Sequence, residues 1–252
     1  MNFPSIVVSS NFNQATRQTK NAIEKSLEMS GPIALIAKKG LFQTYERSEP
    51  KTNLYISREE AIIAITSEIE QDATVVSTTG MASRELYEYR EKNNLGHQRD
   101  FLTVGGMGHA SQIALGIALF QHKRKVYCLD GDGAAIMHMG SLAISGNSKS
   151  ENFVHILLNN GVHASVGGQP TVGLQIDFCK IASACGYKNF FRAKDSVGIK
   201  QALLKINGLG GPSFIEVQTT SKNRKDVGRP TSSPIENKLA LMNFFALKNE
   251  KN

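Results

Sequence analysis

Tryptophan is absent from this chain of 252 residues, and cysteine occurs only three times, at Cys128, Cys179 and Cys185. An odd number of cysteines without metal-ligand spacing gives no sign of a disulfide framework or of a cysteine-based zinc site. We therefore expect three reduced thiols, mostly buried as small apolar side chains.

Long hydrophobic runs are also missing. The longest, residues 113–120, contains Gly116 and is far shorter than the roughly 20 residues that cross a bilayer. The N-terminal residues MNFPSIVV have no charged segment followed by a long apolar one, so they do not resemble a signal peptide. The sequence predicts a cytoplasmic protein without a membrane partner.

Common nucleotide-binding motifs are absent as well. No GxxxxGK[ST] loop occurs, and the glycine-rich segments at Gly106 and Gly131 lack the third glycine of the dinucleotide fingerprint. No zinc motif, long basic arm or alternation of aromatic and basic residues indicates a nucleic-acid partner. The formal net charge of +7 fits an anionic cofactor or substrate, or simply a basic surface.

From Ser57 onward, apolar runs alternate with amphipathic segments. This pattern predicts an α/β fold with a parallel sheet flanked by helices on both faces. A capping box formed by Ser57 and Glu60 opens the first helix, residues 57–69. We expect strands at residues 74–78, 101–104, 126–129, 153–158, 189–192 and 213–219. Further helices are expected at residues 84–92, 111–121, 134–145, 177–185, 196–206 and 235–247.

Residues 1–50 have too few elements for a domain. A helix at residues 14–29 and a short strand at residues 33–37 cannot enclose a core. This piece either packs on the rest of the chain or completes another subunit. A polar linker is expected at residues 46–53, and residues 51–252 form the main domain with a C-terminal tail.

Polar residues end two neighbouring strands in the segment 125–168. The first strand ends at Asp130-Gly131-Asp132-Gly133 and the next at Asn159-Asn160. A right-handed crossover makes these strands parallel, so both motifs lie at the same edge of the sheet. The Asp132 carboxylate, the Asn160 side-chain carbonyl and the main-chain carbonyl of Val162 are oxygen ligands that suit Mg²⁺.

The glycines of the first motif favour a phosphate next to the metal. Gly131 and Gly133 let the backbone approach closely, and the N–H groups of Ala134 and Ala135 lie at the start of the next helix. Either motif alone could be an ordinary surface turn or hairpin turn. Together they predict a metal–diphosphate site.

The two motifs resemble the signature of the thiamine-diphosphate enzymes, which is Gly-Asp-Gly, about 25 residues and Asn-Asn. Here Gly131-Asp132-Gly133 is followed by residues 134–158 and then by Asn159-Asn160. The resemblance implies thiamine diphosphate and Mg²⁺ as cofactors, and a diphosphate-binding domain of that fold. It gives Asp132, Asn160 and Val162 the role of metal ligands.

Two further glycine-rich segments are candidates for cofactor contact. Gly80 follows the strand at residues 74–78, and Gly106, Met107 and Gly108 precede the helix at residues 111–121. These glycines could also serve only close packing of helix on sheet.

Four segments narrow the resemblance to phosphonopyruvate decarboxylase and sulfopyruvate decarboxylase: residues 57–62, 105–119, 159–171 and 228–238. The implied reaction is non-oxidative loss of CO₂ from a small anionic 2-oxo acid, 3-phosphonopyruvate or its sulfonate analogue. His109 and His163 are candidates for proton transfer or anion binding, against the alternative of ordinary surface or core histidines. Arg58 could meet the phosphonate, although a solvated charge is the simpler interpretation.

Enzymes of this family also have a pyrimidine-binding domain, whose glutamate activates the cofactor. Residues 1–50 resemble only the final part of such a domain, and none of its four glutamates, Glu24, Glu28, Glu46 and Glu49, has the right context. The resemblance therefore implies a homo-oligomer or a hetero-oligomer with a pyrimidine-domain chain. The alternatives are a β-type subunit of a sulfopyruvate decarboxylase, a truncated product, or a binding module without catalytic activity.

Overall fold

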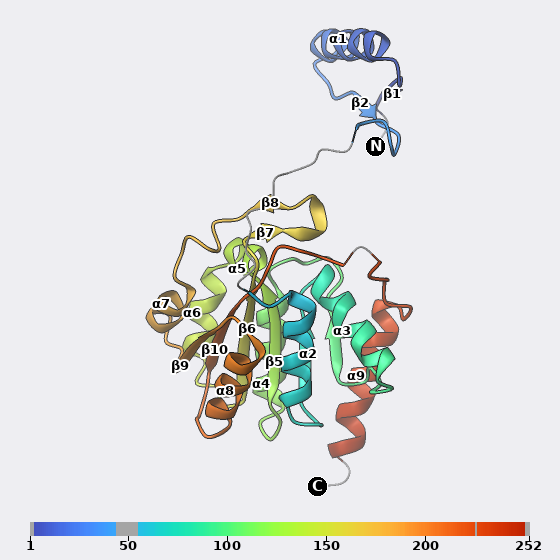
Figure 1. Ribbon diagram of the computed structural model, residues 1–252. Coiled ribbons are helices and arrows are strands. Elements are labelled where there is room, and N and C mark those ends of the chain that lie inside the picture. Colours follow the sequence, from blue (N-terminus) through green and yellow to red (C-terminus); the bar gives the residue numbers. More distant parts are fainter. Residues whose placement is uncertain (1–2, 44–54, 225, 250–252) are drawn as a thin grey trace. The chain divides into compact units, whose positions relative to one another are not determined.

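The computed structural model describes residues 3–43, 55–224 and 226–249, in two compact units, residues 1–50 and 51–252 (Figure 1). The linker expected at residues 46–53 lies outside the described residues. The interpretation of the first unit as a remnant of a pyrimidine-binding domain remains a prediction. Among the described residues, no helix is both long and apolar enough to cross a bilayer.

A parallel sheet of six strands forms the centre of the second unit, in the order β4-β3-β5-β6-β10-β9. The strands are β3 (Thr74–Ser77), β4 (Asp100–Leu102), β5 (Val126–Gly131), β6 (Phe153–Asn159), β9 (Asn189–Ala193) and β10 (Ser213–Gln218). After β3 the chain continues to β4 on one side, whereas after β5 it continues to β6 on the other. The order therefore reverses between β3 and β5, and open α/β sheets bind their ligands at such a point.

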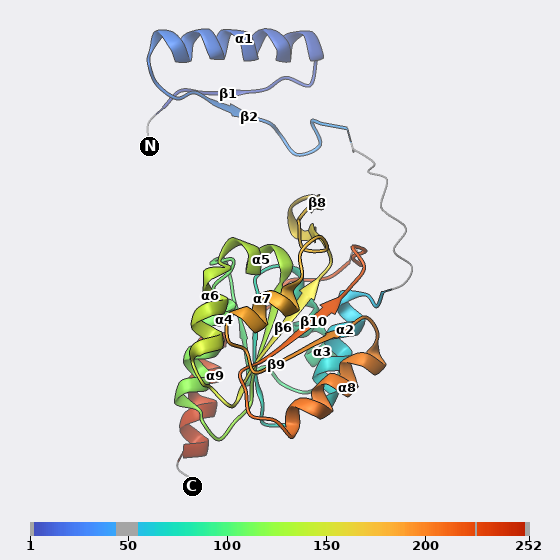
Figure 2. The same cartoon turned by 90° about the vertical axis from the view of Figure 1, so that its left-hand side faces the viewer.

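Helices cover both faces of this sheet, which confirms the predicted fold class. Figure 2 shows α2 (Arg58–Glu68), α3 (Met81–Lys92) and α8 (Ser196–Asn207) on one side of the sheet. On the other lie α4 (Ala110–Phe120), α5 (Asp132–Met137), α6 (Gly140–Asn147) and α7 (Phe178–Ala184). Each face of the sheet forms a hydrophobic core with its helices, and alternate residues of β5 point into the two cores. Tyr127 and Leu129 face the first group of helices, and Val126 and Cys128 face the second.

The predicted capping box opens α2. The Ser57 hydroxyl accepts from the Glu60 N–H at 3.2 Å, and the Glu60 carboxylate accepts from the Ser57 N–H at 3.0 Å. The next residue, Arg58, is not a solvated charge, since it is buried and forms a two-point ion pair with Glu85 at 2.8 Å. This pair ties α2 to α3.

The C-terminal helix α9 (Pro234–Asn249) packs along the edge strand β4. The side chain of Asn237 accepts from the Leu102 N–H at 2.9 Å and donates to the Asp100 carbonyl at 2.8 Å. One amide side chain thus takes the place of a neighbouring strand on this edge.

Some local features differ from the sequence prediction. The helix expected at residues 134–145 is two helices, α5 and α6, because the chain leaves helical geometry at His138, whose ring packs under Gly108. Residues 162–170 contain a short hairpin, β7 (Val162–His163) and β8 (Gln169–Pro170). All three cysteines are free, but only Cys128 is fully buried.

The first unit is a βαβ segment. Strands β1 (Ser5–Val7) and β2 (Ala34–Ile36) pair in parallel, and α1 (Phe12–Glu28) connects them. The sequence allowed one or two strands here but located only the one at residues 33–37, which corresponds to β2. Large apolar side chains stay exposed, with Phe12 at 82% and Leu27 at 75%.

Candidate functional site

A cavity opens at the carboxyl edge of the sheet, between the segments that follow β3 and β5. It measures about 90 Å³ and belongs to the second unit alone. Its wall combines Thr78, Thr79 and Met81 after β3 with residues 130–134 at the end of β5 and with Asn160 and residues 162–165 after β6. The cavity therefore lies at the reversal of strand order, where the predicted metal motif also ends.

Asp132 is a buried carboxylate in this wall. It is 2% exposed, and its carboxylate accepts hydrogen bonds from the Thr171 hydroxyl and from the backbone N–H groups of Asn160 and Gly133. Burial raises the pKa of Asp132, and these hydrogen bonds only partly oppose the rise. Among the described residues, no cationic side chain forms an ion pair with Asp132, and Arg58 of the same cavity wall pairs with Glu85 instead. Such a buried carboxylate is a suitable ligand for a divalent cation.

The two other predicted metal ligands lie beside it. Asn160 follows β6 directly, and its side-chain oxygen accepts from the Val162 N–H at 3.1 Å. Val162 is paired with Pro170, which has no N–H, so its carbonyl receives no hydrogen bond from its strand partner. Asp132, Asn160 and Val162 all line the cavity, and a carboxylate, an amide oxygen and a main-chain carbonyl are a donor set that fits Mg²⁺.

Two glycines allow neighbouring segments to pack closely against this wall. A Cβ on Gly133 would lie 2.5 Å from the His163 ring, and a Cβ on Gly173 would lie 2.5 Å from the Asp132 carboxylate. Only glycine therefore allows these segments to approach the metal motif so closely.

The other predicted cofactor contacts divide into two groups. Met107, Gly131, Gly133 and Ala134 line the cavity. Outside its wall are Gly80, Gly106, Gly108 and Ala135, although Gly80 lies between the lining residues Thr79 and Met81.

The two candidate histidines differ in their position relative to the cavity. His163 lines the cavity directly after Val162. His109 is exposed at the start of α4 and does not line the cavity; its ring lies 4.4 Å from that of His138. Of the two, His163 is therefore the better-placed proton donor or anion contact.

The contacts of Asn159, the first asparagine of the motif, were not found from the sequence. The side chain of Asn159 donates to the Gly173 carbonyl at 2.9 Å and to the Glu216 carboxylate at 2.8 Å. These bonds hold the segment that brings Thr171 onto Asp132. Their partners lie 14 and 57 residues away, which a local motif does not reveal.

Comparison with known families shows the family to which the chain belongs. Residues 76–217 match the model of the thiamine pyrophosphate enzyme, C-terminal TPP binding domain. This chain belongs to the thiamine pyrophosphate enzymes. The match covers the strands, from β3 to β10, that carry the cavity.

Several similar proteins are decarboxylases. The phosphonopyruvate decarboxylase of Streptomyces viridochromogenes is 37% identical over 180 residues, which cover 71% of this chain and 44% of that protein. The sulfopyruvate decarboxylase subunit beta of Methanothermobacter thermautotrophicus is 36% identical over 170 residues, 68% of this chain and 85% of that subunit. The chain thus spans less than half the length of the phosphonopyruvate decarboxylases that it matches.

A solved relative supports the fold. The thiamine diphosphate-dependent 4-hydroxybenzoylformate decarboxylase of Rhodococcus jostii superposes with a TM-score of 0.55 at 18% identity. The superposition covers 71% of this chain and 35% of that one.

Proposed function

We propose that this chain is the diphosphate-binding half of a thiamine diphosphate-dependent decarboxylase that releases CO₂ from 3-phosphonopyruvate and forms phosphonoacetaldehyde. The observation that carries the proposal is the convergence of Asp132, Asn160 and Val162 on one wall at the reversal of strand order. The similarity to phosphonopyruvate decarboxylases supports the choice of substrate.

Each part of the wall has a role in this proposal. Asp132, Asn160 and the Val162 carbonyl hold Mg²⁺, and Gly131, Gly133 and the N–H groups at the start of α5 accommodate the diphosphate. When bound, thiamine diphosphate supplies the electron sink that decarboxylation of a 2-oxo acid requires. His163 binds the anionic substrate or moves a proton at the cavity.

The size of the cavity supports a site shared with another chain or domain. At about 90 Å³ it is well below the roughly 300–1,000 Å³ of pockets that enclose a ligand of drug size. The second unit therefore offers one wall for the cofactor. A chain with a pyrimidine-binding domain would supply the opposite wall and the activating carboxylate, and we propose the first unit as a remnant of such a domain.

Sulfopyruvate is the second candidate substrate, because the match covers most of a sulfopyruvate decarboxylase subunit but less than half of a phosphonopyruvate decarboxylase. The matched segment covers 85% of the Methanothermobacter subunit beta but only 44% of the Streptomyces viridochromogenes phosphonopyruvate decarboxylase. In that case the chain would be one subunit of a two-chain enzyme and would act on the sulfonate analogue.

The test compares both substrates under the same conditions. The full chain is mixed with Mg²⁺, thiamine diphosphate and a chain that carries a pyrimidine-binding domain, and CO₂ release is measured from each substrate. A higher kcat/KM for 3-phosphonopyruvate supports the main proposal, and a higher value for sulfopyruvate supports the second. Metal-dependent cofactor binding without turnover of either would indicate a binding module.

A further inference from the structure

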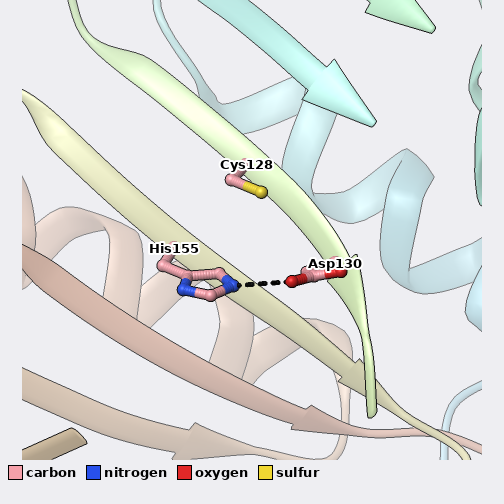
Figure 3. A group of neighbouring side chains, drawn as sticks. All are labelled: Cys128, Asp130 and His155. Atoms are coloured by element: carbon pink, nitrogen blue, oxygen red, sulfur yellow. Dashed lines mark hydrogen bonds and ion pairs between the residues drawn. The ribbon is translucent and has the colours of Figure 1, made fainter. Parts of the chain in front are cut away.

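A buried group of polar side chains lies behind the metal motif, on the face of the sheet that α4 to α7 cover. Figure 3 shows Cys128 and Asp130 on β5 and His155 on the neighbouring strand β6, with their side chains on one side of the sheet. All three are at most 1% exposed. His155 does not line the cavity.

The hydrogen bonds of His155 connect two elements to the metal motif. Its Nε2 lies 3.2 Å from Oδ2 of Asp130, and its Nδ1 lies 3.0 Å from the hydroxyl of Tyr187. Asp130 uses its other oxygen, Oδ1, to accept from the Gly131 N–H at 2.9 Å. Gly131 directly precedes the metal ligand Asp132.

The donors and acceptors can be assigned in one direction. The Asp130 carboxylate only accepts, so Nε2 of His155 carries the proton and Nδ1 accepts from Tyr187. The hydrogen bonds therefore run in one direction, from the Tyr187 hydroxyl to His155 and from His155 to Asp130, whose other oxygen accepts from the Gly131 N–H.

We propose that Tyr187, His155 and Asp130 are positioning residues that fix the Gly131–Asp132 turn, and with it the Asp132 carboxylate, for Mg²⁺ and diphosphate. The proposal rests on the proposed function for its purpose, but not for its geometry. A carboxylate held at both oxygens cannot rotate, so the Gly131 N–H keeps its direction and the next residue its place.

A metal ion in this group is the alternative. The ligand atoms of Cys128, Asp130 and His155 lie within 4.8 Å of one another. A metal would have to break the hydrogen bond between His155 and Asp130. Burial and the nearby Asp130 charge also raise the pKa of the Cys128 thiol well above its ordinary value, which disfavours the thiolate that binds metals.

The test measures hydrogen exchange of the Gly131 amide in the full chain without cofactor. In the Tyr187→Phe variant the ring stays but its hydroxyl is lost, and we expect amide exchange at Gly131 to accelerate about tenfold, as for the loss of one hydrogen bond. His155→Leu should have a larger effect, whereas His155→Gln places an amide donor near the former Nε2 and should restore most of the protection. The amide of Ile215 in β10 should not change, which shows that the sheet remains folded.

Two further measurements complete the design. Nitrogen-15 NMR of the native chain should show His155 with the proton on Nε2, and Tyr187→Phe should shift Nδ1. Cys128→Ala is the matched control and should leave Gly131 exchange unchanged. If His155→Leu does not fold, Gly131 exchange in Tyr187→Phe and His155→Gln still tests the proposal.

Two results would overturn the proposal. One is unchanged Gly131 exchange in folded Tyr187→Phe. The other is a bound metal in the purified native chain that Cys128→Ala removes. If Gly131 behaves as expected but no variant or native chain binds Mg²⁺ and thiamine diphosphate beside a pyrimidine-domain chain, the network stands and the proposed function fails.

Discussion

At the scale of single residues, the Asp132 carboxylate connects the stability of the chain with its proposed role. A carboxyl whose pKa is raised on folding holds its proton more tightly in the folded chain. Its ionisation therefore destabilises the fold as the pH rises through that pKa. A bound cation removes this destabilisation, which is how a buried acid can favour metal binding.

Asp132→Asn separates these two effects. The variant should abolish Mg²⁺-dependent cofactor binding, because the charged ligand is gone. Its metal-free melting temperature at neutral pH should equal or exceed that of the native chain, and the excess should disappear as the pH falls. Calorimetry for binding and thermal unfolding between pH 5 and 8 check this. A lower melting temperature at every pH would mean that the carboxylate is a structural group.

The two asparagines of the motif should respond differently. Asn160→Ala removes a metal ligand and should weaken Mg²⁺-dependent cofactor binding by about 100-fold, since even outer partners of a metal change its affinity by about 10–100-fold. Asn159→Ala leaves Glu216 and the Gly173 carbonyl short of a donor, and should lower the free energy of unfolding by about 1–3 kcal/mol. Urea unfolding and calorimetry on both variants give the comparison; equal loss of affinity would contradict the ligand assignment.

At the scale of elements, the capping box of α2 gives a pH-dependent contribution. The hydrogen bond with Ser57 lowers the pKa of Glu60. The box therefore stabilises the fold above the ordinary value of 4.5, and this contribution is lost as the pH falls through the lower folded pKa. Ser57→Ala should lower the free energy of unfolding by about 1 kcal/mol at pH 7 and by less near pH 4. Urea unfolding at both pH values measures this, with Ser67→Ala on the same helix as the control.

The edge strand β4 depends on α9. Asn237→Ala removes both hydrogen bonds to the backbone of β4 and leaves buried groups unpaired, so we expect a loss of about 1–3 kcal/mol in the free energy of unfolding. Exchange of the Leu102 amide should increase more than that of the central strands. The neighbouring Lys238→Ala should have almost no effect; an equal loss there would mean that the helix as a whole, not this amide, supports the strand.

At the scale of the whole molecule, the predictable parts were those encoded locally. Strands β5 and β6 are apolar runs that end in polar motifs, and parallel pairing follows from the helix between them, so Asp132 and Asn160 could be placed together. The Ser57 box is equally local. The resemblance of the two motifs to the thiamine-diphosphate signature predicts the family, and the match to the family model confirms it.

The parts that sequence reasoning missed depend on contacts distant in the chain. The break between α5 and α6 arises where His138 meets Gly108, and the network of His155 needs Tyr187 from beyond α7. Neither His138 nor Tyr187 stands in a recognisable motif. Which face of a buried strand a histidine occupies, and what it meets there, is decided by tertiary packing.

At the same scale, we propose that this chain supplies one wall of a cofactor site and that a pyrimidine-binding domain supplies the other. The most direct test measures CO₂ release from 3-phosphonopyruvate, with Mg²⁺ and thiamine diphosphate, by the full chain alone and after addition of a chain that carries such a domain. We predict turnover only in the mixture, and loss of that turnover with Asp132→Asn. Turnover by this chain alone would contradict the account, because the activating carboxylate would then lie within its own residues.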